Sequence, residues 1–129
     1  SEKNLTCSLT VSPNLIIKCD VNRMQRVFDN LLRNAYFYSF DNSQIEIMVR
    51  QNEKDVNICF RNHGDTIPKE KLERIFEQFY RLDTSRSSKS GGAGLGLAVS
   101  KEIVELHKGT ITAKSENEQI EFMITIPAG

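Results

Sequence analysis

Two asparagines in this sequence have the type and spacing expected of a polar ligand site. Asn30 and Asn34 stand four residues apart, and Tyr38 follows after another four. On a helix, this spacing places all three side chains along one line. A buried amide without a hydrogen-bond partner costs about 1–3 kcal/mol, so each amide requires a partner. That partner can be a protein group, a ligand or a hydrated cation, and Tyr38 is either a core tyrosine or an aromatic surface beside a ligand.

A glycine-rich run follows later in the chain, at residues 91–97. Gly92, Gly94 and Gly96 lie where a loop is predicted to enter a helix. Glycine permits close approaches that a β-carbon blocks, and the free N–H groups at a helix start favour phosphate. The run is not a dinucleotide-binding fingerprint, because polar residues 84–90 precede it, and it is not a P-loop, because no Gly-Lys-Ser/Thr follows. A phosphate-binding loop and a merely flexible loop both remain open.

A third polar group lies between a predicted strand and a predicted helix, at residues 61–68. Asn62 offers a carbonyl acceptor and amide donors, and Gly64 removes side-chain bulk beside it. Such a pair could bind the edge of a purine base. A plain strand-to-helix turn is the alternative.

The elements that must position these residues follow from hydrophobic periodicity. Alternating apolar residues predict strands, and an apolar arc of Met24, Val27, Phe28, Leu31 and Ala35 predicts a helix capped by Asp20. Strands broken by three helices predict an α/β fold, a two-layer α/β sandwich whose mixed sheet is covered on one face by three helices. The expected elements are a strand over 5–11, an apolar run over 15–19, a helix over 20–38, a hairpin of 45–49 and 56–60, a short helix over 68–76, a loop over 77–94, a helix over 95–107 that stops at Gly109, and a hairpin of 111–113 and 120–126.

Charge, length and cysteine content limit the function classes. Seventeen Lys and Arg residues balance seventeen Asp and Glu residues in a single predicted domain of 129 residues. Without a net field to attract nucleic acid, we expect no nucleic-acid partner. No apolar run approaches the ~20 residues that span a bilayer. Cys7, Cys19 and Cys59 lack a CxxC spacing, which favours reduced core thiols in a cytosolic setting over disulfides or a metal site.

The three polar groups, taken in this order and spacing, resemble sequence boxes of the catalytic, ATP-binding domain of sensor histidine kinases. The resemblance covers nearly the whole chain, with boxes at 30–35, 62–68, 75–81 and 92–97. The stretches FEQFYR and GGAGLGLAVSKEIVELHKG are the most specific, and their wording is similar to that of the vancomycin-resistance sensor kinases. The resemblance implies a Bergerat-type fold with a flexible ATP lid over about 77–94.

The resemblance also implies roles for residues of the first two boxes. Asn34 would be a catalytic residue and the ligand of a Mg²⁺ ion that bridges the phosphates, which suits a hard cation that takes oxygen ligands. Asn30 would assist through hydrogen bonds. Tyr38 would lie against the adenine, Asn62 would receive the adenine amino group, and Gly64 would leave room for the base.

Residues of the last two boxes would act on the phosphates. Arg81, at the hinge of the lid, would meet the γ-phosphate as a cation. Gly92, Gly94 and Gly96 would let the lid close over the triphosphate, and Leu97 belongs to the same nucleotide-binding box.

The reaction implied by the resemblance is phosphoryl transfer from ATP to a histidine on a separate dimerisation and phosphoacceptor domain, and onward to a response regulator. His63 and His107 are not candidate acceptors. Hydrolytic relatives carry a glutamate where this chain has Asn30, and an amide cannot accept the proton of an attacking water, so we expect negligible hydrolysis. The domain alone is expected to be a monomer, and its parent a homodimer in the cell membrane with this domain in the cytoplasm.

Three positions depart from the pattern of the family. Asn62 stands where aspartate is usual, Thr66 where a second glycine is usual, and Phe37 where a basic residue is usual. These departures leave open a second hypothesis, a degenerate nucleotide-binding module that docks onto partners without transferring phosphate.

Overall fold

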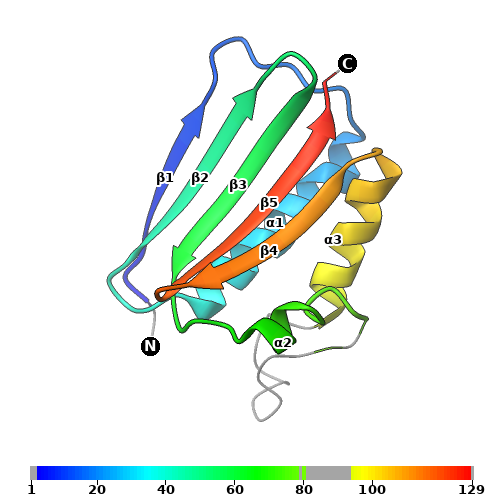
Figure 1. Ribbon diagram of the computed structural model, residues 1–129. Coiled ribbons are helices and arrows are strands. Elements are labelled where there is room, and N and C mark those ends of the chain that lie inside the picture. Colours follow the sequence, from blue (N-terminus) through cyan, green and yellow to red (C-terminus); the bar gives the residue numbers. More distant parts are fainter. Residues whose placement is uncertain (1–2, 79, 81–93, 129) are drawn as a thin grey trace.

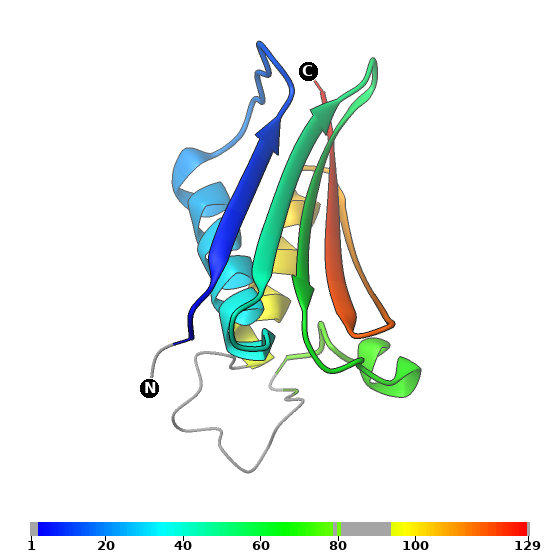
Figure 2. The ribbon, with the colours of Figure 1, turned by 90° about the vertical axis from the view of Figure 1, so that its left-hand side faces the viewer.

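A mixed five-stranded sheet carries two long helices on one face (Figure 1). The structure is a computed structural model and describes residues 3–78, 80 and 94–128. Figure 2 shows both long helices on the same side of the sheet, which confirms the predicted two-layer α/β fold. The strands are β1 (Thr6–Val11), β2 (Gln44–Gln51), β3 (Asp55–His63), β4 (Thr110–Glu116) and β5 (Gln119–Pro127), and the long helices are α1 (Val21–Tyr38) and α3 (Gly94–Leu106).

The sheet has the strand order β1-β2-β3-β5-β4. β1 pairs with β2 in parallel, and the other neighbours are antiparallel. β3 therefore lies in the middle of the sheet, and its last residues reach the end of the sheet where the C-terminal end of α1 also lies (Figure 1). This arrangement brings Asn62 near Tyr38.

The first helix forms where the periodicity predicted it. The side chain of Asp20 accepts a hydrogen bond from the Arg23 N–H at 3.1 Å, which caps the helix start. Val27 and Leu31 are fully buried against the sheet. Asn34 is also buried, at 5% exposure, so one of the two predicted amides lies inside the apolar face and not at its border.

The short helix after Pro68 differs from the prediction. α2 (Lys69–Leu72) is a single turn, and the chain continues through tight turns instead of extending the helix to Phe76. Ile75 is 3% exposed, and the Phe76 ring lies 6.1 Å from that of Phe122. The turns direct these two side chains into the core, and α2 remains at the end of the sheet near β4, so only α1 and α3 cover the face (Figure 1).

Edge position explains where predicted burial is wrong. The residue types of β1 alternate as expected but their burial does not: Leu9 is 65% exposed and Val11 46% exposed, because β1 has a single strand neighbour. Cys7 on this strand is exposed, whereas Cys59 on β3 is buried. The prediction of core thiols is therefore correct for Cys59 and wrong for Cys7.

The last helix ends as its glycine predicted. Lys108 adopts a φ of 63°, and a side chain on Gly109 would overlap the Thr125 carbonyl. α3 begins at Gly94, within the predicted lid. Residues 79 and 81–93, most of that lid, lie outside the described residues.

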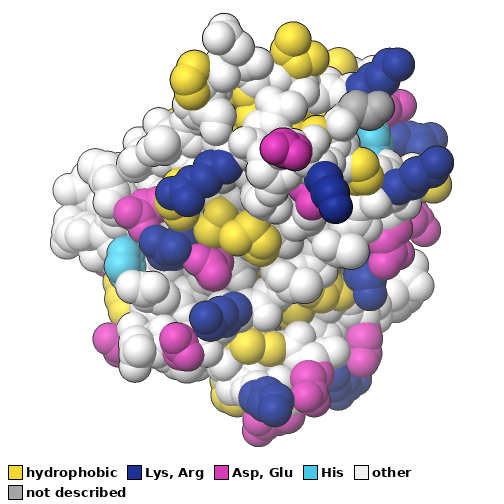
Figure 3. All heavy atoms as spheres, turned by 45° about the horizontal axis from the view of Figure 1, so that its top comes forward, with side chains coloured by type: hydrophobic (Ala, Val, Ile, Leu, Met, Phe, Trp, Pro, Cys, Tyr) yellow, Lys and Arg dark blue, Asp and Glu magenta, His cyan; other side chains and the backbone are white. Residues whose placement is uncertain are grey.

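Charges are mixed over the surface in Figure 3, where basic and acidic side chains are interspersed on the face shown. The balanced composition is consistent with this distribution. Among the described helices, none has the length and apolar character required to cross a membrane.

An ionic network crosses the open face of the sheet. Arg61 donates to Glu121 at 2.9 Å and to Glu46 at 3.4 Å, and the Cys59 thiol donates to the same Glu121 oxygen at 3.4 Å. Burial and the nearby Glu121 raise the pKa of Cys59 to about 11. Burial alone would raise the pKa of Glu121, but hydrogen bonds from Arg61 and Cys59 outweigh it and lower that pKa below its usual value.

This network predicts a loss of stability in acid. A carboxyl group with a lowered folded pKa stabilises the fold above its unfolded pKa, and this contribution disappears as the pH falls through the folded pKa. We expect Glu121→Gln to reduce the free energy of unfolding by about 1 kcal/mol at pH 7 in urea titrations. The difference from the unchanged protein should narrow near pH 3. Glu116→Gln, at the exposed end of β4, is the control. A difference in the free energy of unfolding between Glu121→Gln and the unchanged protein that is as large at pH 3 as at pH 7 would contradict the prediction.

Candidate functional site

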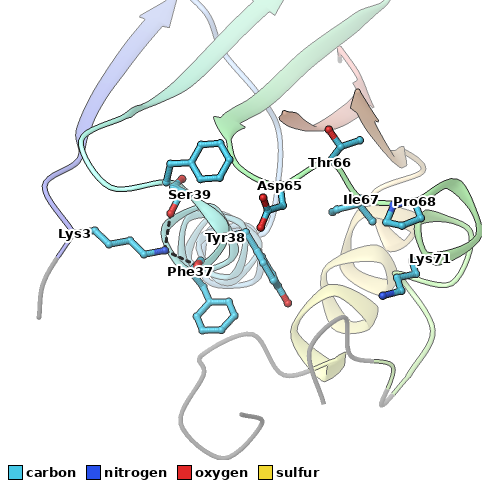
Figure 4. A pocket seen from close by; sticks show the side chains of 10 residues that line it. Lys3, Phe37, Tyr38, Ser39, Asp65, Thr66, Ile67, Pro68 and Lys71 are labelled. Carbon is cyan, nitrogen blue, oxygen red and sulfur yellow. Dashed lines mark hydrogen bonds between the residues drawn. The ribbon is translucent and has the colours of Figure 1, made fainter. Parts of the chain in front are cut away.

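A cavity of about 490 Å³ lies between the C-terminal end of α1 and the turn that follows β3 (Figure 4). Its volume is in the range of small-molecule sites, about 300–1,000 Å³. Figure 4 shows Tyr38 and Lys71 facing it from opposite sides. The lining residues are Lys3, Phe37, Tyr38, Ser39, Phe40, Asp65, Thr66, Ile67, Pro68 and Lys71.

One wall of the cavity is a turn fixed to the β4–β5 hairpin. The Gly64 N–H donates to the Glu118 carbonyl at 3.1 Å, and the Glu118 N–H donates to the Thr66 hydroxyl at 2.7 Å. The Ile67 N–H donates to the Ser115 hydroxyl at 2.9 Å. The threonine that replaces a usual glycine therefore uses its hydroxyl to hold the turn in place.

Gly64 is required by the packing of α1 against this turn. A β-carbon at Gly64 would overlap the carbonyl oxygen of Tyr38. The sequence predicted that this glycine leaves room for a base. The structure gives the space to the helix backbone instead, so Gly64 serves the site by setting how closely the end of α1 approaches the turn.

A lysine from the N-terminal segment holds the end of α1. The Lys3 ammonium donates to the carbonyls of Tyr36 at 2.9 Å, Phe37 at 2.6 Å and Ser39 at 2.7 Å. A cation at a helix C-terminus is stabilised by the helix dipole. Burial lowers the pKa of Lys3, and the charge of Asp41 partly offsets that effect. The sequence analysis missed Lys3, because no local pattern links it to a helix end more than thirty residues away.

Asn62 carries a buried polar atom that the protein does not use. The residue is 2% exposed, and its Nδ2 has no hydrogen-bond partner among the described residues. Such an unpaired donor costs about 1–3 kcal/mol. Nδ2 lies 3.4 Å from the position that a β-carbon on Gly64 would take, at the base of the turn that lines the cavity. The amide therefore carries a buried donor that no described residue accepts.

Asn34 uses one half of its amide within its own helix. Its Nδ2 donates to the Asn30 backbone carbonyl at 2.8 Å. The donor is thereby held, and Oδ1 makes no hydrogen bond to the described residues. An amide oxygen is a suitable ligand for Mg²⁺, so the residue fits the predicted metal role.

Asn30 joins the two helices through hydrogen bonds. Its Nδ2 donates to the Gly96 carbonyl at 3.1 Å and to the Ser100 hydroxyl at 3.2 Å, and that hydroxyl donates to the same carbonyl at 2.8 Å. Ser100 is fully buried. The sequence analysis missed Ser100, although it lies four residues after Gly96 and therefore on the same side of α3.

The structure thus brings several predicted site residues together at one end of the fold. Asn30 meets Gly96, and Gly64 meets Tyr38. The backbone of Gly94 begins α3. The structure places Leu97 in the hydrophobic core at 5% exposure, which differs from the predicted contact with nucleotide. Arg81 and Gly92 lie outside the described residues.

Comparison with known protein families gives one decisive match. Residues 19–129 match the family described as histidine kinase-, DNA gyrase B-, and HSP90-like ATPases. The chain belongs to this ATPase family. The match includes every predicted site residue from Asn30 to Leu97 and agrees with the Bergerat-type fold.

Relatives within this ATPase family are named as sensor kinases. The chain is 49% identical over 115 residues to the sensor protein VanS of Enterococcus faecium, which covers 89% of this chain and 30% of that protein. It is 40% identical to VanSC of Enterococcus gallinarum, over 98% of this chain and 35% of that protein. It is 44% identical to WalK of Staphylococcus aureus, over 84% of this chain and 27% of that protein. The chain thus spans about a third of the length of these curated relatives.

Solved structures share the fold of this ATPase domain. The catalytic domain of histidine kinase ThkA, in a nucleotide-free form, matches with a TM-score of 0.81 at 28% identity, over 97% of this chain and 78% of that one. Full-length ShkA in complex with AMPPNP matches with a TM-score of 0.81 at 23% identity, over 96% of this chain and 26% of that one. The second likeness concerns the fold alone.

The hydrogen bonds of Asn30 give a testable consequence. Asn30→Asp removes the donor to Gly96 and Ser100 and places a carboxylate against the Gly96 carbonyl. We expect the free energy of unfolding, measured by urea denaturation, to fall by about 1–3 kcal/mol. Asn22→Asp, on the exposed first turn of α1, is the control, because an acid there agrees with the helix dipole and should change stability by no more than about 0.5 kcal/mol. Equal losses in the two variants would show that Asn30 does not join the helices.

Proposed function

We propose that this domain binds ATP with Mg²⁺ in the cavity at the end of α1 and transfers the γ-phosphoryl group to a histidine on a separate helical domain. The observation that carries the proposal is the buried Asn62 amide, whose Nδ2 has no partner among the described residues; Asn62 lies on β3 just before the turn that lines a cavity of about 490 Å³. Membership of the ATPase family and the sensor-kinase names of its relatives support it.

The base of the nucleotide is assigned to the side of the cavity between the end of α1 and the turn that follows β3. Asn62 would hydrogen-bond the polar edge of the purine, because its amide is buried and lacks a partner among the described residues. Tyr38 lines the cavity and would offer its ring to the face of the base. The turn tied to Glu118 keeps this wall in place before the ligand arrives, which lowers the entropy lost on binding.

The metal is assigned to Asn34, whose Nδ2 is anchored and whose Oδ1 makes no hydrogen bond to the described residues. When bound, Mg²⁺ would neutralise phosphate charge and take most of its remaining ligands from phosphate and water. The residue itself holds the oxygen in place, because its Nδ2 is tied to the Asn30 carbonyl. Anchoring of this kind is what a positioning ligand requires.

The phosphates are assigned to the region between α1 and α3, where Gly96 meets Asn30 at the start of α3. Lys3 and Lys71 line the cavity together with one acidic residue, Asp65. Lys3 lies 5.9 Å from the centre of the Phe37 ring, so a cation stands close to the position where the family usually has a basic residue. Arg81 and the glycines of the lid keep their predicted roles toward the triphosphate.

Transfer, and not hydrolysis, is the reaction that these residues favour. The Asn30 amide donates to Gly96 and Ser100 and cannot take a proton from water. His107 is not available as the acceptor, because it accepts the Asp20 N–H at 3.0 Å through Nε2 while its Nδ1 pairs with the Ile103 carbonyl at 2.9 Å. Both of its ring nitrogens therefore belong to the fold.

The relatives suggest where the domain works. Because they are named sensor proteins and this chain spans about a third of their length, we infer a membrane sensor with this domain in the cytoplasm. Its partners would be the parent's own dimerisation and phosphoacceptor domain and, through it, a response regulator. The parent would be a homodimer and the isolated domain a monomer.

Calorimetry with Asn34→Ala tests the binding step. Removing the amide oxygen should weaken Mg²⁺-dependent binding of ATP by about tenfold or more, equivalent to about 1.4 kcal/mol. Binding measured in EDTA should change little. Asn22→Ala, which removes an exposed amide from the same helix, is the matched control and should bind like the unchanged protein. Unaltered affinity of Asn34→Ala in Mg²⁺ would contradict the metal assignment.

A radiolabelling experiment distinguishes a kinase domain from a module that only binds nucleotide. The domain is mixed with its parent's histidine-bearing helical segment and ATP labelled on the γ-phosphate. Label on the histidine supports transfer. Calorimetric binding of ATP without label would instead support the module that docks onto partners.

A further inference from the structure

Asn62 presents both a hydrogen-bond donor and an acceptor at the buried end of β3. We propose that the site accepts 6-oxopurine nucleotides, such as inosine triphosphate, with an affinity comparable to that for ATP, because Asn62 can turn its amide to match either purine edge. This inference rests on the proposed function, since it requires that the nucleotide base reaches Asn62.

No hydrogen bond to the described residues fixes the Asn62 amide in one orientation. Its Nδ2 has no hydrogen-bond partner among the described residues, although the side chain is 2% exposed. Neither polar atom of the amide bonds to a described residue, so no hydrogen bond within that part of the chain is lost when the amide rotates by 180° and exchanges donor and acceptor.

Adenine and hypoxanthine differ along one edge. Adenine places an amino donor at position 6 and an acceptor at N1, and hypoxanthine places an oxygen acceptor at position 6 and an N–H donor at N1. An amide has one donor and one acceptor side by side. In one orientation Asn62 accepts from the adenine amino group, and after rotation its Nδ2 donates to the 6-oxygen of hypoxanthine. Each base can therefore make one hydrogen bond to the Asn62 amide, adenine through Oδ1 and hypoxanthine through Nδ2.

A carboxylate at the same position would not have this freedom. An ionised carboxylate only accepts hydrogen bonds. It would pair with the 6-amino group of adenine and face the lone pairs of a 6-oxygen. Asn62 is thus the residue that decides base selectivity, and aspartate at this position would exclude the 6-oxo edge.

Calorimetry in Mg²⁺ with three nucleotides tests the inference on the unchanged chain. ATP and inosine triphosphate differ only along the edge in question. Purine riboside triphosphate, which has hydrogen at position 6, serves as the reference. We expect ATP and inosine triphosphate to bind within about tenfold of each other, and the reference to bind about 5- to 100-fold more weakly than either, as expected for the loss of one buried hydrogen bond.

Asn62→Asp provides the second measurement, with circular dichroism to verify folding. This variant should retain its affinity for ATP, and its affinity for inosine triphosphate should fall by about tenfold or more relative to that for ATP. Asn57→Asp makes the same change on the open face of β3, where Asn57 accepts the Thr125 hydroxyl at 3.0 Å, and should leave the ratio of the two affinities unchanged. If Asn62→Asp does not fold, the comparison of the three nucleotides on the unchanged chain still decides.

Two results would overturn the inference. If ATP binds and inosine triphosphate binds no better than the reference, Asn62 does not accept the 6-oxo edge, while the proposed function stands. If none of the three nucleotides binds, the proposed function fails and the inference fails with it.

Discussion

Buried amides must find hydrogen-bond partners, and this constraint organises the end of the fold that carries the cavity. The three asparagines of this region meet it to different degrees. Asn30 is paired with α3. Within the described part of the chain, the Asn34 amide has a partner for its Nδ2 and none for its oxygen, and the Asn62 Nδ2 has no partner. An unpaired buried polar atom is costly, so a ligand that pairs with it would gain that hydrogen bond on binding. The candidate site is thus the region in which buried side-chain amides have polar atoms without a hydrogen-bond partner among the described residues.

A rigid frame surrounds these amides. The turn after β3 is held by Glu118 and Ser115 of the last hairpin, and the end of α1 is held by Lys3. A side chain at Gly64 would overlap the helix backbone, so the distance between turn and helix is fixed by packing. The frame therefore presents the amide and aromatic groups in one arrangement before any ligand binds. This is the form of positioning that phosphoryl transfer requires, because its catalysis depends on geometry and charge more than on covalent chemistry.

Local patterns predicted most of the frame, and long-range contacts account for what they missed. The arc of α1 and the two hairpins follow periods of 3.6 and 2 residues, which sequence displays directly. The resemblance that named the site residues was confirmed at the level of the family. The Lys3 contacts join segments more than thirty residues apart, and the exposure of Leu9 depends on which strand lies at the edge. Neither the Lys3 contacts nor the exposure of Leu9 can be predicted from a short stretch of sequence. The roles predicted for Arg81 and Gly92 remain predictions, because both residues lie outside the described part.

Side-chain amide resonances of the ¹⁵N-labelled domain, followed by NMR, test the central claim most directly. A non-hydrolysable ATP analogue is added first in EDTA and then with Mg²⁺. The NH₂ resonance of Asn62 should shift with nucleotide in both conditions, because the amide pairs with the base. That of Asn34 should shift mainly when Mg²⁺ is present, and that of Asn30, already paired within the protein, should move least. An Asn62 resonance that stays in place at saturating nucleotide, while other signals move, would contradict the account.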